Sequence, residues 1–211
     1  VELVAPAYPS APPRLLAAGQ AEIAISYQPN LYQQVDRGLP VARIGTLIAT
    51  PLNALVALAD GPVETIADLE GRVVGYSVGG FEDVLLGTML ETVGLALEDV
   101  TLVNVNFALT PALLSGRAAA VIGAFRNFEL NQIALEGREG RAFYPEEHGV
   151  PAYDELIYLA RRDDLDREAL AGFLRAVERA TLWQTNHPDE ALDLFLAAHP
   201  ELDDPLNRLA W

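Results

Sequence analysis

The sequence predicts an α/β protein made of two similar units. Short runs of apolar, often β-branched residues alternate along the chain with helical stretches that end at glycine. One pattern also occurs twice: a short helix, a glycine stop and a strand, with the glycines at positions 19 and 116. Both strands end in polar or aromatic residues, at the edge where open α/β sheets bind ligands. The repeat favours two lobes facing one cleft, with two ordinary helix–strand connections as the alternative.

The first series of elements is defined mainly by prolines and glycines. Pro12 and Pro13 open a helix and Gly19 closes it, while Gly38 stops a second helix. Between and after these helices the apolar runs indicate strands, and strand–helix alternation is typical of parallel sheets. We expect helices at residues 14–18 and 31–37, and strands at residues 1–4, 22–26, 41–48 and 54–59.

The second series begins near residue 68 and repeats this alternation. A glycine turn separates its first strand from a long helix, and Thr110 is expected to cap a helix that starts with Pro111. We expect strands at residues 72–77, 100–106, 118–125 and 155–160, and helices at residues 81–93, 110–115, 127–135, 167–184 and 188–197.

Charge and composition exclude several classes of function. The net charge of −16 opposes binding to nucleic acid or anionic membranes. The chain has no cysteine, which excludes thiolate chemistry and disulfides, and no lysine, which excludes a Schiff base with pyridoxal phosphate. No histidine lies at metal-site spacing, and the longest uncharged stretch, residues 44–59, is short for a membrane span. We therefore expect no cofactor, no metal, no catalysis and no direct membrane insertion.

Two strand-to-helix junctions carry side chains that suit a ligand. Residues 77–83 place a glycine turn before a helix, where free N–H groups attract an anionic or carbonyl oxygen. Residues 123–129 offer Phe125 for stacking on a planar ring and Glu129 as an acceptor for an amidine-like N–C–N edge. The alternatives are an ordinary turn, and a glutamate that only favours its own helix start.

These motifs together resemble the NMT1-like solute-binding proteins, in the subgroup associated with thiamine pyrimidine precursors. The resemblance covers essentially the whole chain and is carried by Ser26-Tyr27-Gln28-Pro29-Asn30, Gly45-Thr46-Leu47-Ile48, Pro51-Leu52-Asn53-Ala54-Leu55, Gly75-Tyr76-Ser77, Gly79-Gly80-Phe81 and Gly123-Ala124-Phe125-Arg126-Asn127-Phe128-Glu129.

The resemblance implies a type II periplasmic-binding-protein fold, in which two α/β lobes are joined by two crossover strands around a ligand cleft. It implies lobe one at residues 1–68 plus 150–211, without the family's first strand and helix, and lobe two at residues 69–149. The crossings are then expected near residues 60–70 and 148–156. It further implies an ABC permease as partner and a periplasmic or extracytoplasmic location, with a lipid anchor on an N-terminal segment left open.

The resemblance also implies a site for a small aminopyrimidine, with Glu129 on the amino edge and Phe125 on a ring face. The residues expected to line the cleft are Ser26, Tyr27, Gln28, Asn53, Gly79, Gly80, Phe81, Asn106, Phe125, Arg126 and Glu129. Arg126 stands where pyrimidine binders often have Trp, which keeps a sulfonate, nitrate or other small anion open as the ligand. A pyrimidine synthase of the same fold is the remaining alternative, and the missing lysine opposes it.

Overall fold

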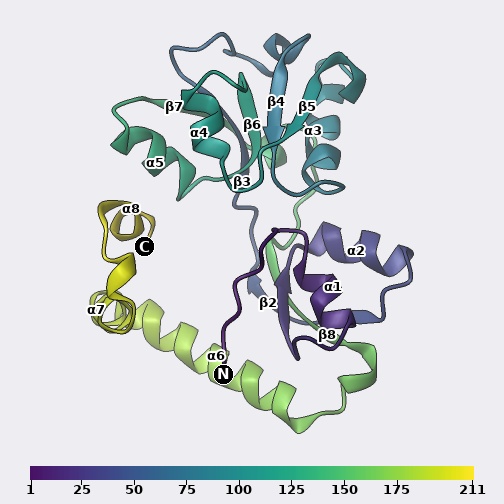
Figure 1. Ribbon diagram of the computed structural model, residues 1–211, viewed down its shortest axis with the longest axis vertical. Helices are drawn as coiled ribbons and strands as arrows, with labels where there is room; N and C mark the ends of the chain where they lie inside the picture. Colours follow the sequence, from purple (N-terminus) through teal and green to yellow (C-terminus); the bar gives the residue numbers. More distant parts are fainter.

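The computed structural model describes residues 1–211 and contains two β-sheets, each with its own helices (Figure 1). The smaller sheet has the order β1-β8-β2, formed by β1 (Ala24–Ser26), β8 (Leu156–Arg161) and β2 (Val41–Ile48). The larger sheet has the order β5-β4-β6-β3-β7, formed by β5 (Thr101–Asn104), β4 (Val73–Tyr76), β6 (Ala120–Phe125), β3 (Asn53–Leu58) and β7 (Gly140–Phe143). We refer to the three-stranded unit and the five-stranded unit.

The five-stranded sheet is covered on both faces, which explains its run of apolar residues. Side chains alternate across a strand, so Leu55 and Ala57 of β3 pack toward α3 (Glu82–Glu91), whereas Ala54 and Val56 pack toward α4 (Leu109–Leu114) and α5 (Glu129–Leu135). These four strand residues are completely buried. Two cores therefore share one sheet.

The three-stranded unit has a smaller core. Leu16 of α1 (Pro12–Ala17) and Leu31 of α2 (Gln28–Asp36) pack with Val41 of β2 and with Ile157 and Leu159 of β8. Because β8 is the central strand, this core joins residues more than 100 positions apart. The unit therefore forms only when β8 returns to the elements at the start of the chain.

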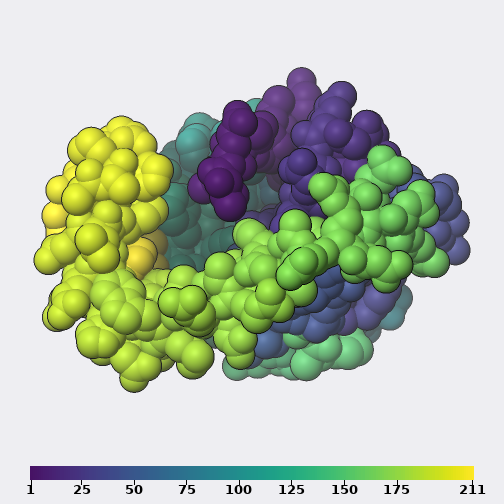
Figure 2. All heavy atoms as spheres, turned by 90° about the horizontal axis from the view of Figure 1, so that it is seen from below, coloured from purple at the N-terminus to yellow at the C-terminus, as the bar shows by residue number.

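The last helices form an arm outside both sheets. Figure 2 shows α6 (Glu168–Asn186) as a rod along one side of the molecule, with α7 (Pro188–Ala198) and α8 (Pro205–Ala210) gathered at its far end. The arm reaches the five-stranded unit, where the side-chain amides of Asn127 and Asn131 donate to the carbonyl oxygens of Ala210 and Leu209 at 3.1 and 3.2 Å. Short 3₁₀ turns complete the chain at Ile66–Leu69, Leu97–Asp99, Pro145–Glu147, Arg162–Asp164 and Pro200–Leu202.

Most expected elements are present, but three expectations were wrong. The strands are not all parallel: β4 is parallel to β5 and β6, while every pairing of β1, β2, β3, β7 and β8 is antiparallel. Residues 1–4 form no strand and are exposed. Thr110 is no cap, since the helix starts after Ala108 and the Thr110 hydroxyl is buried without a partner. Strand β7 and helix α8 were not predicted. None of the helices is long and apolar enough to cross a bilayer.

The first passage between the units lies earlier in the chain than expected. It occupies residues 49–52, not 60–70, because β3 belongs to the five-stranded sheet. Within that sheet β3 pairs with β6 on one side and with β7 on the other. Residues 53–68 therefore belong with the five-stranded unit, and a boundary at residue 68 is wrong. The second passage runs through residues 148–155, between the turn after β7 and the start of β8.

Candidate ligand-binding site

An aromatic contact joins the two units where the passages meet. Tyr27, which follows β1, stacks on Phe81 with ring centroids 4.9 Å apart and an interplanar angle of 28°. Tyr153, from the second passage, meets Phe81 edge-on at 6.0 Å. Phe81 is completely buried within the core of the five-stranded unit. Three rings from three segments of the chain therefore meet at this point, and they would form an aromatic surface for a planar molecule once Tyr27 and Phe81 separate.

Three glutamates lie close enough to this surface to affect Tyr27. Burial raises the pKa of Tyr27 above its usual value, and the charges of Glu82, Glu155 and Glu129 raise that pKa further. Burial also raises the pKa of each of the three carboxyls. The site is therefore acidic and poorly solvated, and it favours a ligand that donates hydrogen bonds or carries a proton.

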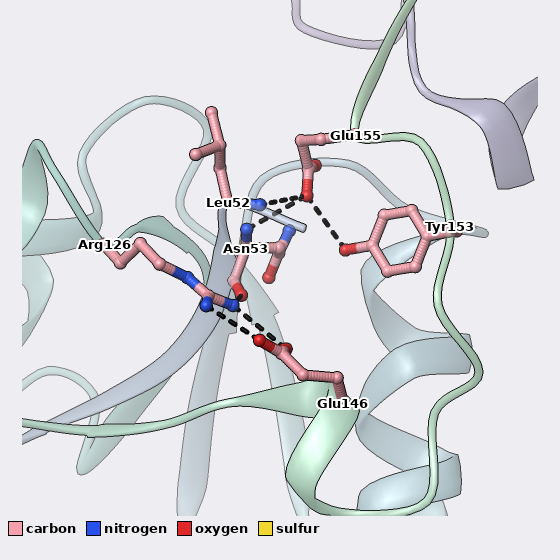
Figure 3. Close-up of polar contacts among 6 residues, drawn as sticks. All are labelled: Leu52, Asn53, Arg126, Glu146, Tyr153 and Glu155. Carbon is pink, nitrogen blue, oxygen red and sulfur yellow. Dashed lines mark hydrogen bonds and ion pairs between the residues drawn. The ribbon is translucent and has the colours of Figure 1, made fainter. Parts of the chain in front are cut away.

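Glu155 ties the two passages together. Its Oε2 accepts hydrogen bonds from the backbone N–H of Leu52 at 2.8 Å, the N–H of Asn53 at 3.0 Å and the Tyr153 hydroxyl at 3.0 Å (Figure 3). The side chain is completely buried, and its Oε1 has no partner. One carboxylate thus fixes the first passage to the second.

Asn53 is a second buried polar group with unused capacity. Its Oδ1 accepts from the N–H of Gly123 at 3.0 Å, while its Nδ2 is buried without a partner. Native structures leave few buried polar atoms unpaired, and those that remain often mark a place for a ligand or water. The Asn53 amide and the Glu155 carboxylate place one unused donor and one unused acceptor at the passages.

Glu129 lies in the first turn of α5, immediately after the strand that ends at Phe125. One carboxylate oxygen accepts from the N–H of Phe125 at 2.6 Å. The other makes no hydrogen bond within the chain, and the carboxyl pKa is raised by burial. Glu129 therefore has a free acceptor, and the Phe125 ring next to it is half-buried.

Arg126 is already engaged. Its guanidinium forms a two-pronged ion pair with Glu146 at 2.8 and 3.0 Å (Figure 3) and donates to the carbonyl oxygen of Asn53 at 3.2 Å. It also lies 4.2 Å from the centre of the Tyr144 ring. The Arg126 guanidinium holds the pKa of Glu146 below its usual value. In this structure the pairing of Arg126 supports the five-stranded unit and leaves its charge satisfied.

Most of the glycine turn is also occupied from within. The Glu82 carboxylate, completely buried at the start of α3, accepts from the N–H of Ser77 at 2.6 Å, the N–H of Val78 at 3.0 Å and the Ser77 hydroxyl at 2.8 Å. Burial raises the pKa of Glu82 to about 7. The expectation that these N–H groups are free was wrong for residues 77 and 78. The N–H of Gly79 has no acceptor within the chain.

The remaining expected site residues have different surroundings. The Ser26 hydroxyl is buried and donates to Asn30 at 3.3 Å. Gln28 accepts from the N–H of Asp154 at 2.7 Å, so it links α2 to the second passage. Asn106 has a left-handed backbone, with φ of 54°, and its N–H is taken by Asn104. No hydrogen bond or aromatic contact links Asn106 with the other expected residues.

The residues missed from sequence are those that acquire their role by distant contact. Tyr153 and Glu155 precede a strand and have no neighbouring motif. A hollow of about 290 Å³ between the units was also missed. Its lining consists of Ser10, Arg14, Asn30, Gln34, Arg37, Leu39 and Gly79.

Comparison with known proteins first defines the class. The fold matches the solved structure of the periplasmic aliphatic sulphonate binding protein SsuA from Escherichia coli, with a TM-score of 0.72 and 17% identity over 90% of this chain and 66% of that one. The expected solute-binding-protein fold is thereby confirmed.

The particular family follows from sequence. Residues 1–191 match the family described as NMT1/THI5 like, and the chain belongs to that family. It is 55% identical over 212 residues to a Haemophilus influenzae protein named as a thiamine biosynthesis protein, and 36% identical over 208 residues to the formylaminopyrimidine-binding protein of Halalkalibacterium halodurans. These matches take in 100% and 98% of the chain, which spans 68% of the first relative and 63% of the second.

Proposed function

We propose that this chain is the ligand-binding part of an ABC importer's solute-binding protein, that it captures a small thiamine-precursor-like aminopyrimidine, and that it performs no catalysis. The observation that carries the proposal is the unused Glu129 oxygen in an acidic, poorly solvated site beside the aromatic surface of Tyr27, Phe81 and Tyr153. Two relatives support it, one named for thiamine biosynthesis and one for binding a formylaminopyrimidine.

The chemistry of an aminopyrimidine suits these groups. The ring nitrogen, when protonated, and the neighbouring exocyclic amine both donate hydrogen bonds, and a carboxylate such as that of Glu129 accepts them strongly. The ring face would stack on Tyr27 or Phe81. These two rings now touch each other, so a ligand placed between them requires the units to separate, as hinge-joined lobes do.

Partner and location follow from the same proposal. A solute-binding protein delivers its ligand to a membrane permease, and the fold shared with a periplasmic binding protein supports an extracytoplasmic site of action. The alternative ligand, a sulfonate, nitrate or other anion held by Arg126, is weakened because Glu146 already pairs with that arginine.

Calorimetric titration with a hydroxymethyl- or aminomethyl-pyrimidine tests the proposal on the wild type and on Glu129→Gln. A hydrogen bond to a charged group contributes about 1.5–3 kcal/mol, so the variant should bind roughly 10- to 150-fold more weakly. Glu136→Gln, at the exposed end of the same helix, is the matched control and should bind as the wild type does.

Two results would contradict the proposal. Equal affinity of Glu129→Gln and the wild type would show that Glu129 does not bind the ligand. Failure of the wild type to bind any pyrimidine would show that the ligand is not a pyrimidine.

A further inference from the structure

The hollow between the units is lined almost entirely by groups that donate hydrogen bonds. Arg14 of α1, Asn30, Gln34 and Arg37 of the α2 region contribute from the three-stranded unit, and Gly79 contributes from the turn after β4. No carboxylate lines it. In a chain with a net charge of −16, this absence of acidic groups around two guanidiniums needs a physical reason.

The two amides in the hollow keep hydrogen-bond donors that no group of the protein uses. Asn30 and Gln34 are only 2% and 8% exposed. The Oδ1 of Asn30 accepts from Ser26, which leaves its Nδ2 without a protein acceptor, and the side chain of Gln34 takes part in no hydrogen bond within the chain. These unpaired amide atoms are not among the fully buried polar atoms of the protein, so they remain open to solvent at the hollow. A ligand that accepts hydrogen bonds can therefore reach them.

The guanidiniums are also free of acidic partners. Arg14 donates only to the carbonyl and hydroxyl oxygens of Ser10, at 3.5 and 3.3 Å, and Arg37 makes no ion pair. Six of the 14 arginines pair with a carboxylate, and Arg14 and Arg37 are among the eight that do not. Arginine offers five N–H donors and no acceptor, in a geometry that matches an oxyanion.

We propose that this hollow binds a small oxyanion, held by Arg14 and Arg37 with the amides of Asn30 and Gln34 and the N–H of Gly79. Because Gly79 belongs to the five-stranded unit and the other four to the three-stranded unit, the bound oxyanion would contact both and stabilise their closed arrangement. The oxyanion is either a free ion or an anionic group on the solute itself. The proposal adds a second recognition element to the proposed function and does not require the ring to be a pyrimidine.

The probe is inorganic phosphate, titrated calorimetrically at low ionic strength into the wild type, Arg14→Gln and Arg37→Gln. Each variant removes one guanidinium from an exposed position, so the fold should be retained, and circular dichroism verifies this. Loss of one charged donor should weaken phosphate binding at least about tenfold. Arg117→Gln removes the same charge from an exposed turn elsewhere and should change affinity less than about twofold.

Two further titrations distinguish a free oxyanion from an anionic group on the solute. If it belongs to the solute, a pyrimidine phosphate ester binds more tightly than the unphosphorylated pyrimidine, and Arg37→Gln abolishes the difference. If it is a free ion, phosphate binds alongside the unphosphorylated pyrimidine, and the ester gains nothing.

The proposal is overturned if the wild type binds no phosphate, or if Arg117→Gln weakens binding as much as the two hollow variants do. Titration with the unphosphorylated pyrimidine in the absence of phosphate measures binding at the Glu129 site alone. Failure of the oxyanion site and failure of the proposed function are therefore separate results.

Discussion

Replacing Glu82 with Gln should change how the stability of the protein depends on pH. Glu82 is completely buried, and its folded pKa is raised by burial from 4.5 to about 7. A carboxyl with a raised folded pKa stabilises the fold fully below its unfolded pKa, and this contribution is lost as the pH rises through the folded pKa. The difference between 4.5 and about 7 corresponds to about 3 kcal/mol, at about 1.4 kcal/mol per pKa unit.

The assay is urea unfolding of wild type and Glu82→Gln at a series of pH values from 4 to 8 (about half-unit steps suffice for the slope). The free energy of unfolding of the wild type should fall relative to that of the variant by about 3 kcal/mol across this range, most steeply between the two pKa values. Glu91→Gln, at the exposed other end of α3, should follow the wild type. Parallel curves for the wild type and Glu82→Gln would refute the reasoning, because they would mean that Glu82 titrates alike in the folded and unfolded chain.

Two further substitutions test the packing around the site. Gly123→Ala should lower the free energy of unfolding by about 2–5 kcal/mol in urea, because Gly123 has a φ of +102° and an added Cβ would collide with the Glu82 carboxylate. Gly38→Ala, with a φ of +85° and open space around it, should lose only about 1–2 kcal/mol, and equal losses for both would disprove the collision. Tyr153→Phe should lower the free energy of unfolding by about 1–3 kcal/mol and raise the pKa of Glu155 further, since the carboxyl loses a hydrogen bond. Unchanged stability in thermal and urea melts would show that this bond contributes nothing.

The elements of the fold were predictable because they depend on local patterns. The run of apolar residues at 41–48 and the glycine after α1 define their elements within a few neighbours, and the structure agrees. Strand direction was not predictable this way, since β8 enters between β1 and β2 from more than 100 residues further along the chain. The strand expected at residues 1–4 is absent for a related reason, because an apolar run forms a strand only when a neighbouring strand pairs with it.

The candidate site shows the same division. Glu129 and Phe125 are identified by one strand-to-helix junction, and both lie there in the structure. Arg126 has the same local signature, but its partner Glu146 comes 20 residues later, so sequence alone left its charge apparently free. Glu155 was missed because its importance lies in two backbone N–H groups more than 100 residues away.

The Glu155 contacts have a mechanical consequence. Two separate segments connect the units, and two unfastened tethers would permit both sliding and turning. Because one carboxylate accepts hydrogen bonds from both segments at the same point, it holds them together where they pass between the units. Tyr153 takes part in this contact and also in the aromatic contact with Phe81. A molecule that enters between the rings would therefore displace a side chain that also holds the two passages together.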